Sequence, residues 1–195
     1  MAQPVLFIVA GPNGAGKSTL TKSGRFERAR IFDPDAVARR MAPDDPARAA
    51  VLAGRRIAQE RRAAMAAGET ILLETTLSGR DVLRLMREAR ATGYRVELHY
   101  IRLESVAVHL LRIECRVRAG GHDVPKADVR RRFSRSMENL PRAMALADET
   151  RFYTNDDPDT PLDEAAIAVF PSGPPPRWVA EACMAALLPL EAEGG

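Results

Sequence analysis

The segment GPNGAGKST, from Gly11 to Thr19, decides how the rest of this 195-residue chain is read. It satisfies the pattern G-x-x-x-x-G-K-[ST], and an apolar run, VLFIVA (residues 5–10), stands directly before it. In this pattern the glycines let the backbone curl so that successive N–H groups point at phosphate oxygens. Lys17 neutralises the β- and γ-phosphates, and Ser18 offers its hydroxyl to Mg²⁺. The segment therefore predicts a loop that binds the phosphates of ATP or GTP.

Nine residues are candidates for contact with the nucleotide. They are Gly11, Asn13, Gly14, Ala15, Gly16, Lys17, Ser18, Thr19 and Asn155. Asn155 lies outside the loop, after a late strand-like segment, and is a candidate for contact with adenine or ribose. A turn formed by Asn155 and Asp156 explains an asparagine at this position equally well.

The composition is that of an ordinary globular protein and limits its partners. There are 29 Lys and Arg against 26 Asp and Glu, and the arginines are spread over several expected helices, which argues against nucleic acid. No apolar run approaches the ~20 residues that cross a bilayer, and residues 5–10 are too short for a signal peptide. Cys115 and Cys183 form no metal or redox spacing. We therefore expect a cytoplasmic protein without membrane contact.

Strand-like and helix-like segments alternate along the chain. The expected strands are residues 5–10, 30–32, 70–73, 94–103, 151–154 and 165–170. The expected helices are residues 17–24, 36–41, 46–67, 80–92, 106–118 with Ser105 as its cap, a segment with Pro125 at its first position, and 177–188. This alternation predicts an α/β fold with a doubly wound, mostly parallel sheet and helices on both faces. We expect a single domain over residues 1–195, and we expect Pro141 to kink or split its helix.

The loop also resembles that of transporter ATPases, and TLSGR (residues 76–80) superficially resembles their signature sequence. The spacing argues against this class, because the signature would lie far downstream of the loop and an aliphatic run ending in Asp-Glu would follow it. Here TLSGR stands about 60 residues after Lys17 and no such run follows. A loop after a strand is the simpler interpretation.

Acidic residues follow two of the expected strands. In a doubly wound sheet, ligands bind at the carboxyl ends of the strands. Asp35 follows Pro34 in a rigid turn and is placed to take a proton from an acceptor hydroxyl, although Asp33 or Asp35 as a helix cap explains the turn equally well. Glu74, together with Thr75 and Thr76, is the candidate for acceptor binding, with a plain loop as the alternative.

Residues 112–140, RIECRVRAGGHDVPKADVRRRFSRSMENL, place a Gly-Gly pair between two arginine-bearing helices. A closing lid needs this arrangement, because it brings guanidinium groups to the transferred phosphate and excludes water. For Arg130 and Arg135 we prefer a solvated helix face. His122 follows the glycines, and we expect it to be structural.

Taken together, GPNGAGKST, FDPDAVA, ETTLSG and the long lid sequence resemble the zeta-toxin family of P-loop kinases, from the first strand to about Leu140. The resemblance implies an ATP-dependent kinase that phosphorylates the 3′-hydroxyl of the amino sugar in UDP-N-acetylglucosamine. It implies that Asp35 is the catalytic base and that Glu74 and Thr76 hold the sugar. It also implies that Arg116, with Arg132 in the same motif, reaches the transferred phosphate.

The chain departs from the family at Asp33, where many relatives have Asn, and in its shorter length. These departures bear on the acceptor more than on the kinase chemistry, and three alternatives stay open. One is a kinase for another hydroxylated metabolite or antibiotic. Another is a nucleotide-dependent switch or nucleic-acid-binding ATPase, for which no sensing element is found. The third is a toxin whose activity an antitoxin protein blocks. The sequence does not decide this alternative, because a surface that binds a partner leaves no motif.

Overall fold

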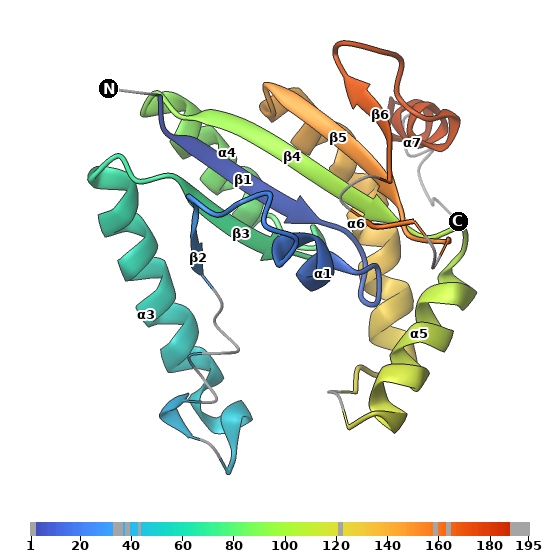
Figure 1. Ribbon diagram of the computed structural model, residues 1–195, viewed down its shortest axis with the longest axis horizontal. Coiled ribbons are helices and arrows are strands. Elements are labelled where there is room, and N and C mark those ends of the chain that lie inside the picture. Colours follow the sequence, from blue (N-terminus) through green and yellow to red (C-terminus); the bar gives the residue numbers. More distant parts are fainter. Residues whose placement is uncertain are drawn as a thin grey trace, which may run out of the picture.

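One six-stranded sheet organises the molecule, and its central strand leads into the phosphate-binding loop (Figure 1). The computed structural model describes residues 3–32, 37, 40–42, 44–120, 123–157, 160–162 and 165–187. The strands are β1 (Val5–Ala10), β2 (Arg30–Phe32), β3 (Ile71–Thr75), β4 (Arg95–Arg102), β5 (Glu149–Thr154) and β6 (Ala166–Phe170). The helices are α1 (Lys17–Thr21), α3 (Pro46–Ala66), α4 (Asp81–Ala91), α5 (Val106–Arg118), α6 (Lys126–Leu146) and α7 (Arg177–Leu187).

The strand order is β2-β3-β1-β4-β5-β6, with every pair parallel except β5 and β6. The mostly parallel α/β sheet predicted from the sequence is therefore confirmed. Neither neighbour of β1 in the sheet is its neighbour in sequence, so the strand order reverses there. Ligands bind at such a reversal, outside the carboxyl ends of the strands.

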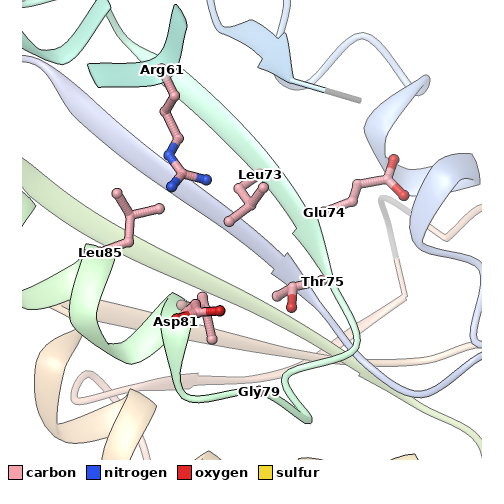
Figure 2. Close-up of a pocket in the computed structure, with 8 residues that line it drawn as sticks. Arg61, Leu73, Glu74, Thr75, Gly79, Asp81 and Leu85 are labelled. Carbon is pink, nitrogen blue, oxygen red and sulfur yellow. The ribbon is translucent and has the colours of Figure 1, made fainter. Parts of the chain in front are cut away.

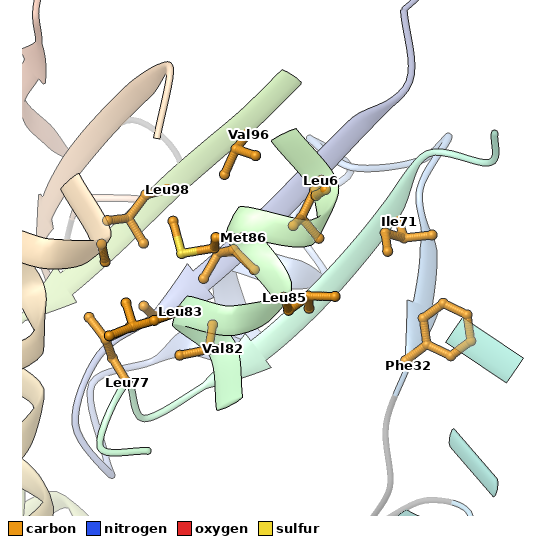
Figure 3. Close-up of a cluster of buried hydrophobic side chains, with 14 of the residues drawn as sticks. Leu6, Phe32, Ile71, Leu77, Val82, Leu83, Leu85, Met86, Val96 and Leu98 are labelled. Carbon is orange, nitrogen blue, oxygen red and sulfur yellow. The ribbon is translucent and has the colours of Figure 1, made fainter. Parts of the chain in front are cut away.

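Two apolar layers cover the two faces of the sheet. On one face α4 packs its buried stripe, including Leu85 and Met86, onto Leu6 and Leu98 of the sheet (Figure 3). On the other face Leu20 of α1 and Phe26 pack in a second cluster. Helices thus lie on both faces, with α4 and α6 on one and α1 on the other (Figure 1). Because β1 and β4 contribute to both layers, their side chains are buried throughout much of their length.

Several expected element boundaries are corrected. The helix after the loop ends at Thr21 rather than residue 24, and β3 extends through Thr75. Pro125 is the residue before α6 rather than its first residue, because its ψ of 133° is not helical. Pro141 does not split α6, which runs on to Leu146. Leu140 and Ala143 are fully buried on either side of it, and this packing compensates for the hydrogen bond that proline cannot make.

Candidate active site

The phosphate loop has the curled backbone that the sequence predicted. Gly11, Gly14 and Gly16 all have positive φ, at 147°, 79° and 102°. A Cβ on Gly11 would collide with the backbone carbonyl of Ile101, and one on Gly16 would collide with the side chain of Asn155. Glycine is therefore required at both positions, by conformation and by the close approach of β4 and β5 segments.

Helix α5 supports this loop through His109. The Nδ1 of His109 lies 2.9 Å from the carbonyl oxygen of Asn13, and the N–H of Leu103 donates to Nε2 over 3.4 Å. The ring is fully buried and meets Phe133 of α6 edge-on, with 5.6 Å between ring centroids. Burial lowers the pKa of His109 to about 4, and the positive charge of Lys17 contributes in the same direction. A neutral ring therefore links the loop to both α5 and α6.

Asn155 supports the loop from the end of β5. Its side-chain amide donates to the carbonyl oxygen of Ala15 over 3.0 Å, and Arg112 of α5 donates to the backbone carbonyl of Asn155. The contact with adenine or ribose for which Asn155 is a candidate stays a prediction. The structure shows that the side-chain amide of Asn155 donates a hydrogen bond to the backbone of the phosphate loop.

Lys17, Ser18 and Glu74 meet at the mouth of the loop. The Nζ of Lys17 donates to the carbonyl oxygens of Gly11 and Pro12, at 2.9 and 3.1 Å. The hydroxyl of Ser18 donates to Oε2 of Glu74 over 3.0 Å. Val9 is paired with Glu74 in the β1–β3 register, which sets that carboxylate beside the loop. The structure therefore joins the expected phosphate-binding residues to the expected acceptor-binding segment.

The electrostatic field at Lys17 includes both predicted lid arginines. Burial lowers the pKa of Lys17 to about 8, and the carboxylate of Glu74 opposes this effect. The positive charges of Arg116 on α5 and Arg132 on α6 lower that pKa further. The two arginines predicted to belong to the lid therefore act on the lysine of the phosphate loop.

The loop after β3 is strained and held from α6. Leu77 has a φ of 60°, which is rare for a residue with a side chain, and it is fully buried. Its N–H donates to the hydroxyl of Thr75 over 3.0 Å, and buried Asn139 donates to its carbonyl oxygen over 2.9 Å. The hydroxyl of Thr76 lies 2.8 Å from that of Ser78. Asn139 therefore fixes the segment predicted to bind the acceptor.

A cavity of about 220 Å³ lies next to this segment, between α3, β3 and α4 (Figure 2). Its walls are Arg61, Leu73, Glu74, Thr75, Gly79, Asp81, Val82 and Leu85. The N–H of Gly11 donates to the carbonyl oxygen of Thr75 over 3.2 Å, so one residue both borders the cavity and bonds the phosphate loop. The cavity itself lies on the face of the sheet that α4 covers, whereas α1 packs on the other face.

Some predicted residues lie outside the described part of the chain, namely Asp33, Asp35 and His122. Thr19 is exposed at the start of α1, and Arg130 and Arg135 are exposed on α6, as a solvated face requires. No motif in the sequence points to His109, Asn139 or Arg61. The position of His109, four residues before Ile113 on a helix face, is the kind of pattern that predicts only burial.

The oxygen atoms at the loop suit a magnesium ion. Mg²⁺ takes one or two protein oxygens and completes its shell with phosphate and water, and Ser18 and Glu74 supply such oxygens side by side. Within the described ranges no three His, Cys, Asp or Glu side chains gather as a metal cluster. The same part of the chain contains no helix with the length and apolarity needed to span a membrane.

The fold and the loop define a protein of the P-loop kinase-like type. The family model described as zeta toxin matches residues 1–160, and the chain belongs to this family. An uncharacterized protein of Haemophilus influenzae is 33% identical over 123 residues, which cover 63% of this chain and 88% of that protein.

Solved structures share the fold at low sequence identity. A structure of the PezAT chromosomal toxin–antitoxin system of Streptococcus pneumoniae aligns with a TM-score of 0.69 and 16% identity, over 92% of this chain and 76% of that one. The complex of AvrRxo1-ORF1 with AvrRxo1-ORF2 and ATP aligns with a TM-score of 0.66 and 18% identity, over 100% of this chain and 66% of that one. At this identity the likeness establishes the fold.

Proposed function

We propose that this protein is an ATP- and Mg²⁺-dependent kinase that transfers the γ-phosphate to a hydroxyl of an amino-sugar nucleotide, UDP-N-acetylglucosamine or a close relative. The observation that carries this proposal is the hydrogen bond from Ser18 of the phosphate loop to Glu74 of β3, 3.0 Å long, which sets the expected acceptor-binding segment beside the loop. The charges of Arg116 and Arg132, which act on Lys17, agree with it. Zeta toxin membership, and a solved neighbour whose structure contains ATP, support the same class.

The residues of this chain divide the work of phosphoryl transfer. The loop N–H groups and Lys17 hold the β- and γ-phosphates, and Ser18 holds Mg²⁺, which neutralises phosphate charge. Asp35 accepts the proton of the acceptor hydroxyl. The hydroxyl oxygen then bonds to the γ-phosphorus, while the bond from that phosphorus to the bridging oxygen of the leaving ADP breaks. Arg116 and Arg132 stabilise the charge that develops on the transferred group. Glu74, Thr75 and Thr76 orient the sugar.

The segment 112–140 acts as a lid in this proposal, within a single domain over residues 1–195. It is connected to the loop through Asn155, because Arg112 donates to the backbone carbonyl of Asn155 and the side chain of Asn155 donates to that of Ala15. Lys126 of α6 pairs with Glu114 of α5 at 2.6 Å, and Ile113, Val124 and Val129 form a small apolar cluster between the two helices. The two arginines are therefore carried on a braced helical pair, which favours precise positioning over large movement.

Substitution of Asp35 tests the chemistry. Asp35→Ala is expected to bind ATP with unchanged affinity and to lose transfer by at least about a hundredfold, as for other general bases. Asp44→Ala is the matched control, because Asp44 is an exposed acid in the same stretch of chain. Phosphoryl transfer by Asp35→Ala at the wild-type rate would show that Asp35 is not the catalytic base.

Incubation with labelled ATP and a panel of metabolites tests the acceptor. We expect the label to appear on UDP-N-acetylglucosamine, at the amino-sugar 3′-hydroxyl. A labelled product of another class would instead establish a kinase for a different hydroxylated metabolite or antibiotic. Hydrolysis stimulated by DNA or RNA, without a labelled acceptor, would contradict the kinase assignment.

An antitoxin partner belongs to the same proposal. The solved neighbours include a toxin–antitoxin system. If the protein acts in the cytoplasm on UDP-N-acetylglucosamine, a peptidoglycan precursor, its expression in bacteria slows growth while that of Asp35→Ala does not. A cognate antitoxin would restore growth on co-expression. Equal toxicity of the wild type and Asp35→Ala would show that the effect on growth does not depend on phosphoryl transfer.

A further inference from the structure

The two peptide groups that flank Arg102, the last residue of β4, both face the phosphate loop or its supports. The carbonyl oxygen of Ile101 lies so close to Gly11 that a Cβ on that glycine would collide with it. On the other side, the N–H of Leu103 donates to Nε2 of His109 over 3.4 Å. A change in the backbone angles of Arg102 would therefore displace two neighbours of the loop at once.

A third connection runs from the end of β4 to the loop through the segment after β5. The N–H of Glu104 donates to Oδ1 of Asp156 over 3.1 Å. The preceding residue, Asn155, donates from its side chain to the carbonyl oxygen of Ala15 in the loop over 3.0 Å. The backbone at the end of β4 is thus joined to the phosphate loop from several directions.

The side chain of Arg102 is held from α7 by Trp178. The guanidinium carbon lies 4.9 Å from the centroid of the Trp178 ring, which is the geometry of a cation–π contact. One guanidinium nitrogen, Nη2, donates to the carbonyl oxygen of Glu104 over 3.4 Å. The Nε is buried and has no hydrogen-bond partner among the residues that the structure describes. Because the hydrogen bonds are few and long, the indole ring is the contact that fixes this guanidinium.

The ring of Trp178 is itself fixed by the core of the sheet. It meets Phe152 of β5 edge-on, with 5.7 Å between ring centroids, and its centroid lies 5.9 Å from that of Tyr100 on β4. Both of these rings are fully buried, and so is Val179, the next residue of α7. The helix α7 (Arg177–Leu187) lies beyond residue 160, where the match to the family model ends.

We propose that Trp178 and Arg102 are positioning residues for the phosphate loop. The indole ring holds the side chain of Arg102, and the backbone on both sides of Arg102 holds the loop in the conformation that binds nucleotide. A helix outside the region that defines the family thereby contributes to ATP affinity. This inference rests on the nucleotide binding of the proposed function and does not depend on the acceptor.

Titration calorimetry with a non-hydrolysable ATP analogue and Mg²⁺ tests this proposal. Trp178→Leu removes the aromatic face and Arg102→Met removes the guanidinium, so each is expected to bind the analogue about tenfold more weakly. Trp178→Phe keeps an aromatic face and should recover most of the affinity. The double variant should lose no more affinity than the weaker-binding single variant, because both substitutions remove the same contact.

Arg95→Met is the matched control, since Arg95 lies at the opposite end of β4, where it forms ion pairs with Glu97 and Glu149. It should bind the analogue as the wild type does, and thermal unfolding should show that every variant is folded. The proposal is overturned if Trp178→Leu and Arg102→Met bind as the wild type does, or if Arg95→Met loses affinity equally. A loss in Trp178→Phe as large as that in Trp178→Leu would overturn it as well, because affinity would then follow packing volume.

The same titrations separate this proposal from the proposed function. A wild type that does not bind the analogue would contradict the kinase function, and this inference with it. Binding by the wild type that is indifferent to Trp178→Leu and Arg102→Met would contradict the positioning role alone.

Discussion

The Nδ1 of His109 donates to the carbonyl oxygen of Asn13, and this contact joins α5 to the phosphate loop across 96 residues of sequence. A carbonyl oxygen can only accept, so Nδ1 carries the proton and Nε2 is the acceptor for the N–H of Leu103. The low pKa of the buried ring keeps this neutral form in place at physiological pH. His109 thus positions the loop without touching the reacting groups.

Replacement of His109 should therefore weaken nucleotide binding in a way that depends on hydrogen bonding. His109→Leu removes the donor, and we expect about tenfold weaker ATP binding together with a loss of ~1–3 kcal/mol in the free energy of unfolding. His109→Asn can still donate from near the Nδ1 position, so it should recover much of the affinity. Calorimetry and urea unfolding measure the two effects. Equal losses in both variants would mean that packing on Phe133 matters and the bond to Asn13 does not.

The pKa of Lys17 predicts how nucleotide affinity changes with pH. Only the protonated ammonium neutralises phosphate, and the pKa of about 8 in the free protein lies below the ordinary 10.5. As pH rises through 8 the free protein loses this proton, so the apparent Kd for ATP should increase, by about tenfold at pH 9. Lys17→Arg stays charged over this range and should show no such increase. A flat profile for the wild type between pH 7 and 9 would contradict the shifted pKa.

Asn139 offers a test of the strained loop after β3. Asn139→Ala leaves the carbonyl of Leu77 without its buried donor, at an expected cost of ~1–3 kcal/mol in unfolding free energy. Because the loop carries Thr75 and Thr76, we also expect the acceptor KM to rise by about tenfold while ATP affinity is unchanged. Glu138→Ala, at the exposed neighbouring position on α6, serves as the control. A rise in KM for ATP and acceptor alike would indicate general loosening of the fold instead.

Two glycines should respond to alanine in opposite directions. Gly11→Ala forces a Cβ into the carbonyl of Ile101 at a φ of 147°, so we expect loss of ATP binding and clear destabilisation. Gly54 lies on the exposed side of α3, and a Cβ added there would have no neighbouring atom within 4 Å, so Gly54→Ala should stabilise the protein by about 0.5–1 kcal/mol. Thermal unfolding checks both. A stabilising Gly11→Ala would show that the loop can adopt another conformation.

Local sequence patterns were sufficient for the parts of the site that depend on neighbours in the chain. The apolar run of β1, the glycines and Lys17 lie within 13 residues of one another, and their order alone specifies a strand, a curled loop and a helix start. The position of Glu74 beside the loop could be predicted because the carboxyl ends of parallel strands meet at one edge of the sheet. The boundaries were less accurate at Thr21 and Pro141, where packing decides whether a helix stops or continues.

What the sequence by itself determined is thus the nucleotide loop, the parallel α/β sheet and the side of the sheet on which acidic and basic groups meet. Only the tertiary structure decided which side chains support that site. His109 forms a hydrogen bond with Asn13, and Asn139 forms one with Leu77, 62 residues away in the sequence. Arg61, on the helix α3, lines a cavity. The reason is physical: each of these contacts exists because distant elements pack against one sheet, and a hydrogen bond formed by packing leaves no periodicity or spacing in the chain.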